Sequence, residues 1–516
     1  MMRLIAWTVA AFPCLLPMAA GPSAAAIVSP AAPVTPASDA LAQLYAARGG
    51  APLWIGSDAA AARREVMLAL LAAEDRTDPA VPAAAPLAAA FALLAPADQQ
   101  AAERALTAAA LGYLARRHGG APVEPNVALR ALEQLDGVDP AAPLALALAQ
   151  LGIVRELGGW RPVGTVPGPA PTAAPLALVS PEVDVAPAFP KRKRLPEVPS
   201  LRRRLVQSGD LSATYLEGDE IDAHLVDAVR RFQARHGLAP DGVAGVRTIA
   251  RLNRPIGDDI AQVRLNLARP QEDRSALPRY VEVNVPGFQL RLIEYGKVVL
   301  RSRVIVGDLE SPTPIFDDRI RFIEINPYWY VPASIAAELT EKEIARPGYL
   351  ERNGFYWRTP ELLVQRPGPE NALGRVKFLF PNHHAVYLHD TPERGMFSRS
   401  VRSLSHGCVR VEKPLELALA LAAPQGWDKA RLDQALASQK TRRIDLDSPV
   451  PVFLDYRTAF VDDRGRLNLR PDLYGHDQAG ITVFPDKGLP PPPPAIPLEA
   501  RNLTPPAEPR RPQAPL

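Results

Sequence analysis

The spacing of apolar residues changes along this chain, and the change divides it into segments that require different folds. Residues 38–160 are rich in Ala and Leu at helical spacing, and Gly and Pro separate the runs, which predicts an all-α N-terminal scaffold. From residue 279 the period becomes two, as in the alternating stretch 280–285, which predicts a mainly-β region built from hairpins. Helical spacing returns at 414–423 and 429–439. We therefore expect a multidomain α+β protein.

Proline is the most unusual part of the composition. It accounts for 57 of the 516 residues, about twice the usual ~5%. Because proline breaks helices and central strands, much of it is expected in linkers and tails. Residues 161–197 hold many prolines and a basic run at 191–194, which predicts a solvated linker. Residues 486–516 include five consecutive prolines, which predicts a disordered or polyproline-like tail.

The first 26 residues have the pattern of an export signal. Arg3 precedes an apolar run over 4–18, and Ala24-Ala25-Ala26 offers a cleavage site, so residues 1–26 are expected to be a signal peptide. The run is shorter than the ~20 residues that span a bilayer. No later segment is long and apolar enough to do so. We therefore expect a periplasmic protein without stable membrane insertion, and the net charge of +3 argues against a dedicated nucleic-acid binder.

One cysteine is expected to remain after export, because Cys14 lies in the predicted signal peptide. A single thiol excludes a disulfide-stapled scaffold and a Cys-rich zinc or iron–sulfur site. The remaining residue, Cys408, has histidines near it in sequence. A thiol attacks a carbonyl as the thiolate, which needs a neighbouring base or a positive field. The stretches that carry these groups read Tyr387-Leu388-His389-Asp390-Thr391-Pro392 and Ser405-His406-Gly407-Cys408-Val409-Arg410-Val411.

These stretches predict the setting of a nucleophile. His389 ends a predicted strand, His406 lies two residues from Cys408, and Arg410 adds positive charge. Gly407 permits a backbone conformation that aims amides at one point, so with the Cys408 N–H it is a candidate oxyanion hole. Two alternatives stay open, an inert buried thiol and a metal site. The candidate metal ligands are His383, His384, His389, His406 and Cys408. They lack a recognised ligand spacing, and we expect no metal.

Residues 198–254 form a separate compact pattern. Its fixed positions are Val229, Phe232-Gln233, Gly237-Leu238, Asp241-Gly242, Gly245, Thr248 and Leu252. This pattern resembles the type 1 peptidoglycan-binding domain, and the resemblance implies a small three-helix module. The same positions also suit a core and its turns, so the fold follows more safely than ligand binding.

The cysteine and histidine stretches resemble the L,D-transpeptidase catalytic domain of the YkuD type. The resemblance runs over about 279–445, with accessory strands to about 480. The whole layout resembles the large periplasmic L,D-transpeptidases of Gram-negative bacteria. It implies that Cys408 is the nucleophile and that His389 accepts and donates the proton. It further implies that His406 supports the site, that Ser405, Gly407 and Arg410 complete it, and that no cofactor is needed. Whether the Asp390 side chain orients His389 stays open.

The resemblance also implies a reaction. Cys408 would attack a tetrapeptide stem of peptidoglycan, release D-alanine, and pass the acyl group to a second stem as a 3→3 crosslink. The alternatives are an L,D-carboxypeptidase, a variant that attaches a lipoprotein, and a catalytically silent peptidoglycan-binding scaffold. The sequence does not distinguish the acyl acceptors, and it does not predict protein partners or the oligomeric state.

Residues 327–373 interrupt the predicted strands. Eight aromatic residues lie between Phe322 and Trp357, which predicts either a satellite hydrophobic core or a lid whose aromatics pack on glycan or stem peptide. We expect an inserted lid. The substrate-binding candidates are Tyr387, Asn326, Trp329 and Tyr356.

Overall fold

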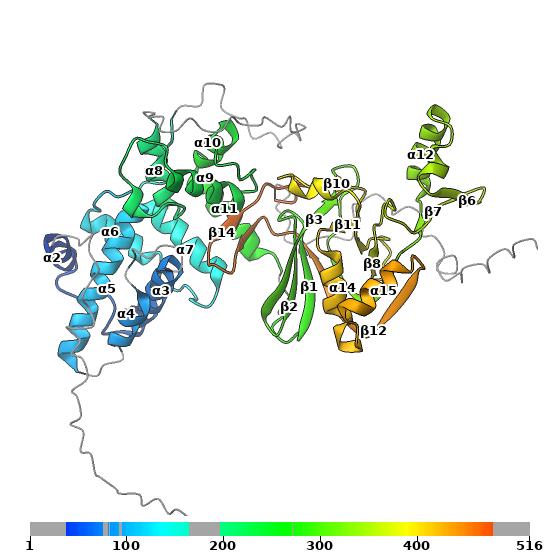
Figure 1. Cartoon of the computed structure of the whole chain (residues 1–516). Coiled ribbons are helices and arrows are strands. Elements are labelled where there is room, and N and C mark those ends of the chain that lie inside the picture. The colour runs from blue at the N-terminus through cyan, green and yellow to red at the C-terminus, as the bar shows by residue number, and fades with distance from the viewer. Residues whose placement is uncertain are drawn as a thin grey trace, which may run out of the picture. The chain divides into compact units, whose positions relative to one another are not determined.

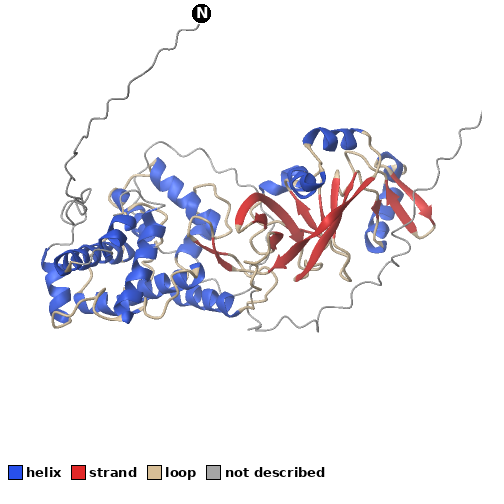
Figure 2. Ribbon diagram, turned by 90° about the horizontal axis from the view of Figure 1, so that it is seen from below, coloured by secondary structure: helices blue, strands red, loops and turns tan. Residues whose placement is uncertain are grey.

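The computed structural model describes residues 38–75, 81, 83–91, 95–164, 197–270 and 272–477, which form two compact units. The described residues of Met1–Gly159 and Val206–Glu217 form one unit, and those of Trp160–Leu205 and Gly218–Leu516 form the other. Figures 1 and 2 show the helices and strands of the described residues. The predicted signal peptide, most of the predicted linker and the predicted tail lie outside the described residues. In the described part of the chain, no helix combines the length and the apolar character needed to cross a membrane.

The first unit is all-helical, as the apolar spacing predicts. Its helices are α2 (Ser38–Ala47), α3 (Asp58–Asp75), α4 (Ala84–Phe91), α5 (Pro96–Arg117), α6 (Pro125–Glu133) and α7 (Pro143–Glu156). Proline stands in the first turn of α5, α6 and α7, where the missing N–H costs no helical hydrogen bond. The Glu103 carboxylate is buried and accepts from the N–H groups of Leu53 and Trp54 at 2.6 and 3.0 Å. It therefore ties α5 to the turn that precedes α3.

The region that resembles a peptidoglycan-binding domain is helical, as predicted. It consists of α8 (Val198–Gln207), α9 (Ala223–Arg235) and α10 (Val246–Leu252), and α11 (Ile256–Ala268), which the sequence analysis does not anticipate, follows. Gln233 explains part of the motif. Its side chain donates to Asp241 at 2.7 Å and to Thr248 at 3.1 Å, and it accepts from the Gly242 N–H at 2.9 Å. These motif residues therefore hold one turn against α9.

The mainly-β part of the second unit is a nine-stranded sheet in the order β10-β3-β11-β9-β8-β4-β12-β1-β2. Strand β3 also pairs with β2, so the strands from β3 to β2 close into a ring. The bounds are β1 (Arg279–Asn284), β2 (Gln289–Glu294), β3 (Lys297–Gly307), β4 (Phe316–Ile325), β8 (Val376–Leu379), β9 (Leu388–His389), β10 (Ser403–Ser405), β11 (Val409–Val411) and β12 (Arg442–Asp455).

Alternation builds the core of this ring. Val281 and Val283 of β1 are fully buried and face Leu292 and Leu290 of β2 across an antiparallel register, so apolar pairs line the inner face. Helices α14 (Pro414–Ala422) and α15 (Lys429–Ala437) add their apolar side chains to the same core. They lie beside β8 and β12 in Figure 1.

Two features of the sheet differ from the prediction. Hairpins account for β1, β2 and β3, but three strand pairs are parallel, β1 with β12, β10 with β3 and β11 with β9. Parallel partners come from distant segments, and a local period of two does not reveal them. The strand that His389 is predicted to end is only two residues long, Leu388–His389. Asn382 exchanges side-chain hydrogen bonds with the backbone of Val386, and this local pairing replaces a ladder there.

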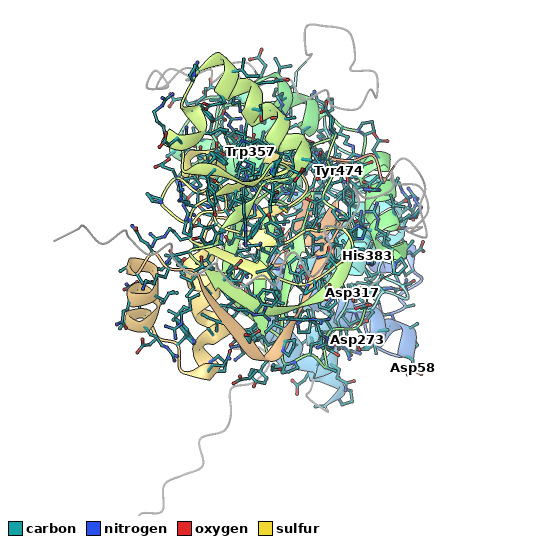
Figure 3. All side chains as sticks on the ribbon, turned by 90° about the vertical axis from the view of Figure 1, so that its right-hand side faces the viewer. Asp58, Asp273, Asp317, Trp357, His383 and Tyr474 are labelled. Carbon is teal, nitrogen blue, oxygen red and sulfur yellow. The ribbon has the colours of Figure 1, made fainter. Side chains whose placement is uncertain are left out.

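The segment between β4 and β8 forms a substructure of its own. It contains β5 (Trp329–Tyr330), α12 (Ala333–Ala345), α13 (Tyr349–Arg352), β6 (Phe355–Thr359) and β7 (Leu362–Gln365), and the sheet order is β5-β7-β6. Its buried apolar residues form a separate small cluster, as the satellite-core interpretation predicts. Trp357 nevertheless remains 45% exposed on this insertion (Figure 3). A two-stranded ribbon of β13 (Ala459–Val461) and β14 (Leu467–Leu469) follows β12.

Candidate active site

Cys408 lies in a short turn that leads from β10 into β11. The Ser405 hydroxyl donates to the Cys408 carbonyl over 2.5 Å, which closes the turn. The Asp308 N–H donates to the Ser405 carbonyl over 2.9 Å and fixes the turn to the end of β3. Gly407, inside the turn, has a φ of +100°, a conformation that side chains disfavour. Within the described ranges, the N–H groups of 406–408 have no hydrogen-bond partner, so they are available to a ligand.

His389 lies on β9 beside this turn. In the parallel pairing of β9 and β11, Arg410 is opposite His389, and the Val409 N–H donates to the Tyr387 carbonyl over 3.1 Å. The imidazole is buried, and its Nδ1 contacts the Asp390 carbonyl at 2.5 Å. A carbonyl only accepts, so Nδ1 carries the proton and Nε2 keeps its lone pair. The backbone thus sets the tautomer that a general base requires.

The surroundings keep both groups neutral at rest. Burial lowers the pKa of His389 to about 3, with a further lowering by the Arg410 charge, while the hydrogen bond to Asp390 acts in the opposite direction. Burial raises the pKa of the Cys408 thiol, against hydrogen bonds from Tyr387 and the positive charge of Lys377. The Cys408 Sγ lies 3.9 Å from the Ala385 carbonyl, as a weak donor. A neutral thiol can pass its proton to a neutral imidazole when the sulfur attacks.

Lys377 is a site residue that the sequence analysis missed. It lies on β8 opposite His389. Its Nζ is 4.4 Å from the centre of the Tyr387 ring and 3.8 Å from a carboxylate oxygen of Glu324. Its charge lowers the pKa values of both His389 and Cys408. A signal was present in the sequence, because this lysine stands between two apolar residues of a predicted strand, but its importance depends on the strand order.

Asp390 supports the site through its backbone and its side chain in different ways. Its carbonyl holds the His389 ring. Its carboxylate is buried and accepts from the N–H groups of Arg375 and Thr391 at 2.8 and 2.7 Å, and from the Arg394 guanidinium at 2.6 Å. Burial raises the pKa of Asp390, and these donors oppose the rise. The carboxylate therefore shapes the loop after β9.

Several predicted residues gather around Cys408. Ser405 and Gly407 belong to its turn, and His389 lies on β9, the strand paired with β11. The Tyr387 ring lies 5.6 Å from the His389 ring in an edge-on arrangement. Arg410 reaches the site as well, but its guanidinium also pairs with Glu393 at 2.5 Å. His406 is exposed, and its side chain makes no hydrogen bond or ion pair within the described part of the chain.

The other predicted site residues, Asn326, Trp329 and Tyr356, make their contacts elsewhere. The buried Asn326 side chain donates to the carbonyls of Ala435 and Leu436 at 3.0 and 3.2 Å, so it ties the end of β4 to α15. Trp329 packs on Phe355 with ring centres 6.0 Å apart. Tyr356 lies under the Arg366 guanidinium at 4.5 Å. No contact among the described residues joins Trp329 or Tyr356 to Cys408 or His389.

The alternative of a metal site receives no support from the arrangement of side chains. In the ranges that the structure describes, no group of three or more His, Cys, Asp and Glu residues is placed to hold a metal ion. His383 and His384 contact each other at 4.8 Å between ring centres, and His384 stacks on Phe316 at 4.9 Å. Figure 3 labels His383.

A thiol, a neutral imidazole with a fixed tautomer and a turn of unpaired N–H groups are the groups that acyl transfer through a cysteine requires. Comparison with known families agrees. Residues 278–430 match YkuD, the "L,D-transpeptidase catalytic domain". Residues 194–252 match the "Putative peptidoglycan binding domain", and residues 39–164 match the "Scaffold domain". The chain therefore contains an L,D-transpeptidase catalytic domain and a type 1 peptidoglycan-binding domain.

Individual relatives carry the same name. A "Putative L,D-transpeptidase" of Haemophilus influenzae is 37% identical over 216 residues, which are 38% of this chain and 44% of that protein. The chain thus spans less than half the length of this curated relative. The L,D-transpeptidase structure from Xylanimonas cellulosilytica is 22% identical, covers 52% of this chain and 98% of its own, and has a TM-score of 0.20. An L,D-transpeptidase structure from Mycobacterium smegmatis is 13% identical, covers 34% of this chain and 58% of its own, and has a TM-score of 0.20. Such low TM-scores carry no argument about activity.

Proposed function

We propose that this protein forms 3→3 crosslinks between peptidoglycan stems through a thioester on Cys408. The observation that carries the proposal is the placement of His389 on β9, the strand paired with β11 directly after Cys408, with its tautomer fixed by the backbone. The Nδ1 atom of His389 is committed to the Asp390 carbonyl at 2.5 Å, and burial lowers its pKa to about 3. The imidazole is therefore neutral, and its Nε2 lone pair is available to receive a proton.

In the first half of the reaction, Cys408 Sγ attacks the carbonyl at the L-centre of diaminopimelate in a tetrapeptide stem. His389 takes the thiol proton, a carbon–sulfur bond forms, and the negative charge moves to the carbonyl oxygen. The unpaired N–H groups of the 406–408 turn are the candidate donors to that oxygen. When the carbon–nitrogen bond breaks, His389 returns the proton to the amine, and D-alanine leaves.

In the second half, the side-chain amine of another stem attacks the thioester. His389 takes a proton from that amine, the carbon–sulfur bond breaks, and Cys408 regains its proton. Water as the acceptor would instead give a tripeptide, the product of a carboxypeptidase. A lipoprotein lysine would give a protein attached to the wall. The chemistry on the enzyme side is the same in all three cases, so the acceptor has to be measured.

The domain composition supports peptidoglycan as the partner of this chain. The binding domain matches a family described by this polymer, and the catalytic domain matches the L,D-transpeptidase family, whose resemblance implies the same polymer as substrate. Two such domains also support a location in the periplasm or the cell wall, and we propose that residues 1–26 direct the export. The insertion between β4 and β8 is proposed as a lid, because Trp357 and Ile344 remain 45% and 77% exposed on it.

The test of the proposed function uses the purified chain and tetrapeptide muropeptides, with products followed by mass spectrometry. We expect a crosslinked dimer one D-alanine lighter than two monomers. Wild-type protein treated with a carbapenem is expected to gain the mass of the drug, and Cys408→Ser is expected to gain nothing. No crosslinked dimer, no tripeptide and no adduct from the wild type would refute the enzyme and leave the binding scaffold.

Two histidine variants form a matched pair in this test. His389→Gln removes the buried imidazole, and we expect it to lose product formation at least about 1,000-fold, as general bases of acyl transfer do. His406→Ala removes an exposed imidazole, and we expect a change of less than about tenfold if it only supports the turn. An inactive His406→Ala with an active His389→Gln would reverse the assignment of the base.

The lid has its own test. A chain without residues 333–353, which include α12 and α13, is expected to keep the carbapenem adduct but to crosslink polymeric peptidoglycan more slowly. The adduct serves as the control for an intact catalytic domain. Unchanged crosslinking of the polymer would contradict the lid.

A further inference from the structure

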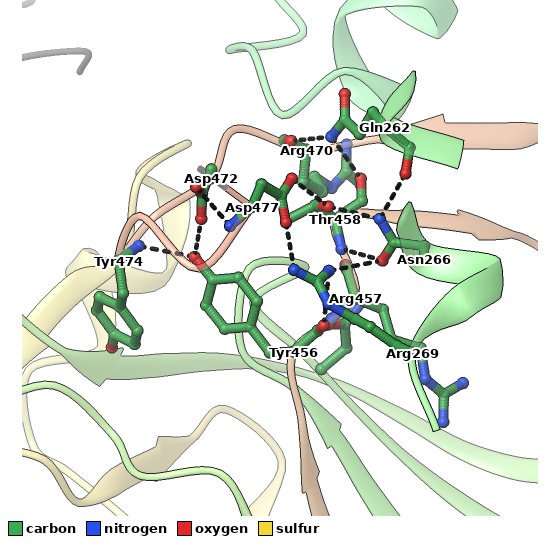
Figure 4. Close-up of polar contacts among 11 residues, drawn as sticks. Gln262, Asn266, Arg269, Tyr456, Arg457, Thr458, Arg470, Asp472, Tyr474 and Asp477 are labelled. Carbon is green, nitrogen blue, oxygen red and sulfur yellow. Dashed lines mark hydrogen bonds and ion pairs between the residues drawn. The ribbon is translucent and has the colours of Figure 1, made fainter. Parts of the chain in front are cut away.

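The chain that follows β12 forms a structure that we call the C-terminal strap, defined as residues 456–477. It lies beyond residues 278–430, which match the catalytic family. Helix α11 holds the strap at Thr458 and Asp477, near its two ends (Figure 4). Asn266 of α11 exchanges hydrogen bonds with the Thr458 hydroxyl and N–H at 2.8 and 3.0 Å, and the Arg269 guanidinium pairs with Asp477 at 2.5 Å.

Tyr474 is the strap residue that contacts Gly307 and Thr313. The Tyr456 hydroxyl donates to Asp472 over 2.6 Å and accepts from the Tyr474 N–H at 2.7 Å, so Tyr474 is fixed from behind (Figure 4). The Tyr474 hydroxyl donates to the Gly307 carbonyl over 2.6 Å and accepts from the Thr313 N–H at 3.2 Å. Burial raises the pKa of Tyr474 to about 12, so this hydroxyl keeps its proton at any working pH.

Thr313 connects Tyr474 to the nucleophile's turn. Its side chain is buried. The hydroxyl donates to the Gly407 carbonyl over 2.8 Å and accepts from the Gly307 N–H at 2.8 Å. Gly307 has to be glycine for this contact, because a Cβ there would lie 2.1 Å from the Ser311 carbonyl oxygen and 2.6 Å from the Thr313 nitrogen. The backbone of the turn over 308–313 therefore packs directly against the end of β3.

The contact at the Gly407 carbonyl has a consequence for the Cys408 N–H. These two groups are opposite ends of one planar trans peptide, so fixing the direction of the oxygen fixes the direction of the N–H. Glycine samples more backbone conformations than any other residue. A restraint from outside the turn is therefore needed to hold this peptide plane. A hydrogen bond to the carbonyl also polarises the peptide and strengthens its N–H as a donor.

We infer that Thr313 is a positioning residue that aims the Cys408 N–H at the acyl oxygen, and that Tyr474 of the C-terminal strap holds Thr313 in place. The inference rests on the proposed function, since an aimed N–H matters when an oxyanion forms. The strap is then part of the acyl-transfer site, although it lies outside the segment that matches the catalytic family.

The test compares two reactions of Cys408 in the full chain. Acylation by a carbapenem passes through a tetrahedral oxyanion, because sulfur adds to the lactam carbonyl before the carbon–nitrogen bond breaks. Alkylation by iodoacetamide forms a carbon–sulfur bond and releases iodide without an oxyanion. Thr313→Val removes the hydroxyl at nearly constant volume. We expect it to lower the acylation rate about 10- to 100-fold and to leave the alkylation rate within about twofold of the wild type.

Three further variants make the result specific. Thr313→Ser keeps the hydroxyl and is expected to restore acylation to within about threefold of the wild type. Tyr474→Phe is expected to slow acylation about three- to tenfold, again without slowing alkylation. Thr107→Val removes a hydroxyl of equal burial in the helical unit and is expected to change neither rate.

The outcomes are distinct. A wild type that forms no crosslinked dimer, no tripeptide and no carbapenem adduct refutes the proposed function itself. A wild type that acylates while Thr313→Val acylates equally fast refutes the inference alone. Parallel loss of both reactions in Thr313→Val and in Tyr474→Phe also overturns it, because that pattern means that the turn has collapsed and that no N–H has been specifically misdirected.

Discussion

The protonation states at rest lead to a prediction about how the reactivity of Cys408 depends on pH. Burial lowers the pKa of His389 to about 3, so the imidazole is neutral above that pH. Burial also raises the pKa of Cys408 above its ordinary value of about 9, so the sulfur is a thiol below that pH. Both shifts have the same cause, since a buried site disfavours the charged form of either group. Between them lies a wide range in which neither group is charged.

The magnitudes follow from these values. At pH 7, a pKa of about 3 leaves roughly one imidazolium in 10,000 molecules, and a thiol pKa above about 9 leaves less than about 1% thiolate. A thiolate–imidazolium pair would behave differently, because its thiolate would persist down to the pKa of the thiol. With neutral partners, the thiolate fraction rises about tenfold for each pH unit from about 6 to 9.

The assay is alkylation of Cys408 by iodoacetamide, with the rate of adduct formation followed by mass spectrometry at each pH. Cys408 is the free cysteine of the described residues, and Cys408→Ser corrects for labelling elsewhere. We expect the logarithm of the rate to rise with a slope near one, without a plateau. His389→Gln is the matched control. It is expected to keep the slope while losing acyl transfer, since one neutral group replaces another.

A different profile would refute this reasoning. If the rate in the wild type rises through a midpoint between about pH 5 and 7 and then stays level, the resting enzyme holds an ion pair. Loss of that plateau in His389→Gln would identify the imidazolium as its partner. The proton would then already be transferred before the substrate arrives, and the general-base step proposed for His389 would be wrong.

Three further predictions concern residues outside the sequence motif. Lys377→Met removes a cation that lowers the pKa of the thiol, and we expect alkylation at pH 7.5 to slow about three- to tenfold; a faster rate would contradict the assigned charge effect. Gly307→Ala places a Cβ 2.1 Å from the Ser311 carbonyl oxygen, and we expect carbapenem acylation to fall at least about tenfold. Gly395→Ala meets no atom within 4 Å and serves as its control. Glu103→Ala leaves buried N–H groups without an acceptor, and we expect it to destabilise the helical unit by about 2–3 kcal/mol in denaturant unfolding followed by circular dichroism, with the carbapenem acylation rate unchanged.

Local patterns were sufficient for the parts of this protein that depend on neighbours in sequence. The periods of 3.6 and two identify the helical region and the first strands, because each side chain packs according to its own element. The nucleophile's turn is equally local. Ser405 and Cys408 close it over three residues, and Gly407 supplies the positive φ. Ser405, Gly407 and Cys408 can therefore be recognised from the sequence without knowledge of tertiary contacts.

The order of the strands in the sheet could not be predicted from the sequence. Lys377 becomes a neighbour of His389 through the pairing of β8 with β9. A charged residue in an alternating strand is ordinarily on the solvent face, so its position between two apolar residues did not distinguish Lys377. Asn326 shows the converse. It precedes an aromatic run, which favoured a role in binding substrate, whereas its amide is used on the carbonyls at the end of α15.

Long-range contacts also explain why a short motif identifies the reacting groups but does not by itself fix their geometry. The motif supplies a thiol, a base and a flexible glycine, but a flexible glycine does not by itself give its N–H group one direction. In this chain the direction comes from Thr313, which is 94 positions from Gly407, and from Tyr474, which is 161 positions from Thr313. Because an oxyanion hole loses its advantage when its donors must reorganise during the reaction, residues that never touch the substrate can still set the rate. A comparison that stops at the matched segment, residues 278–430, includes Thr313 but overlooks Tyr474.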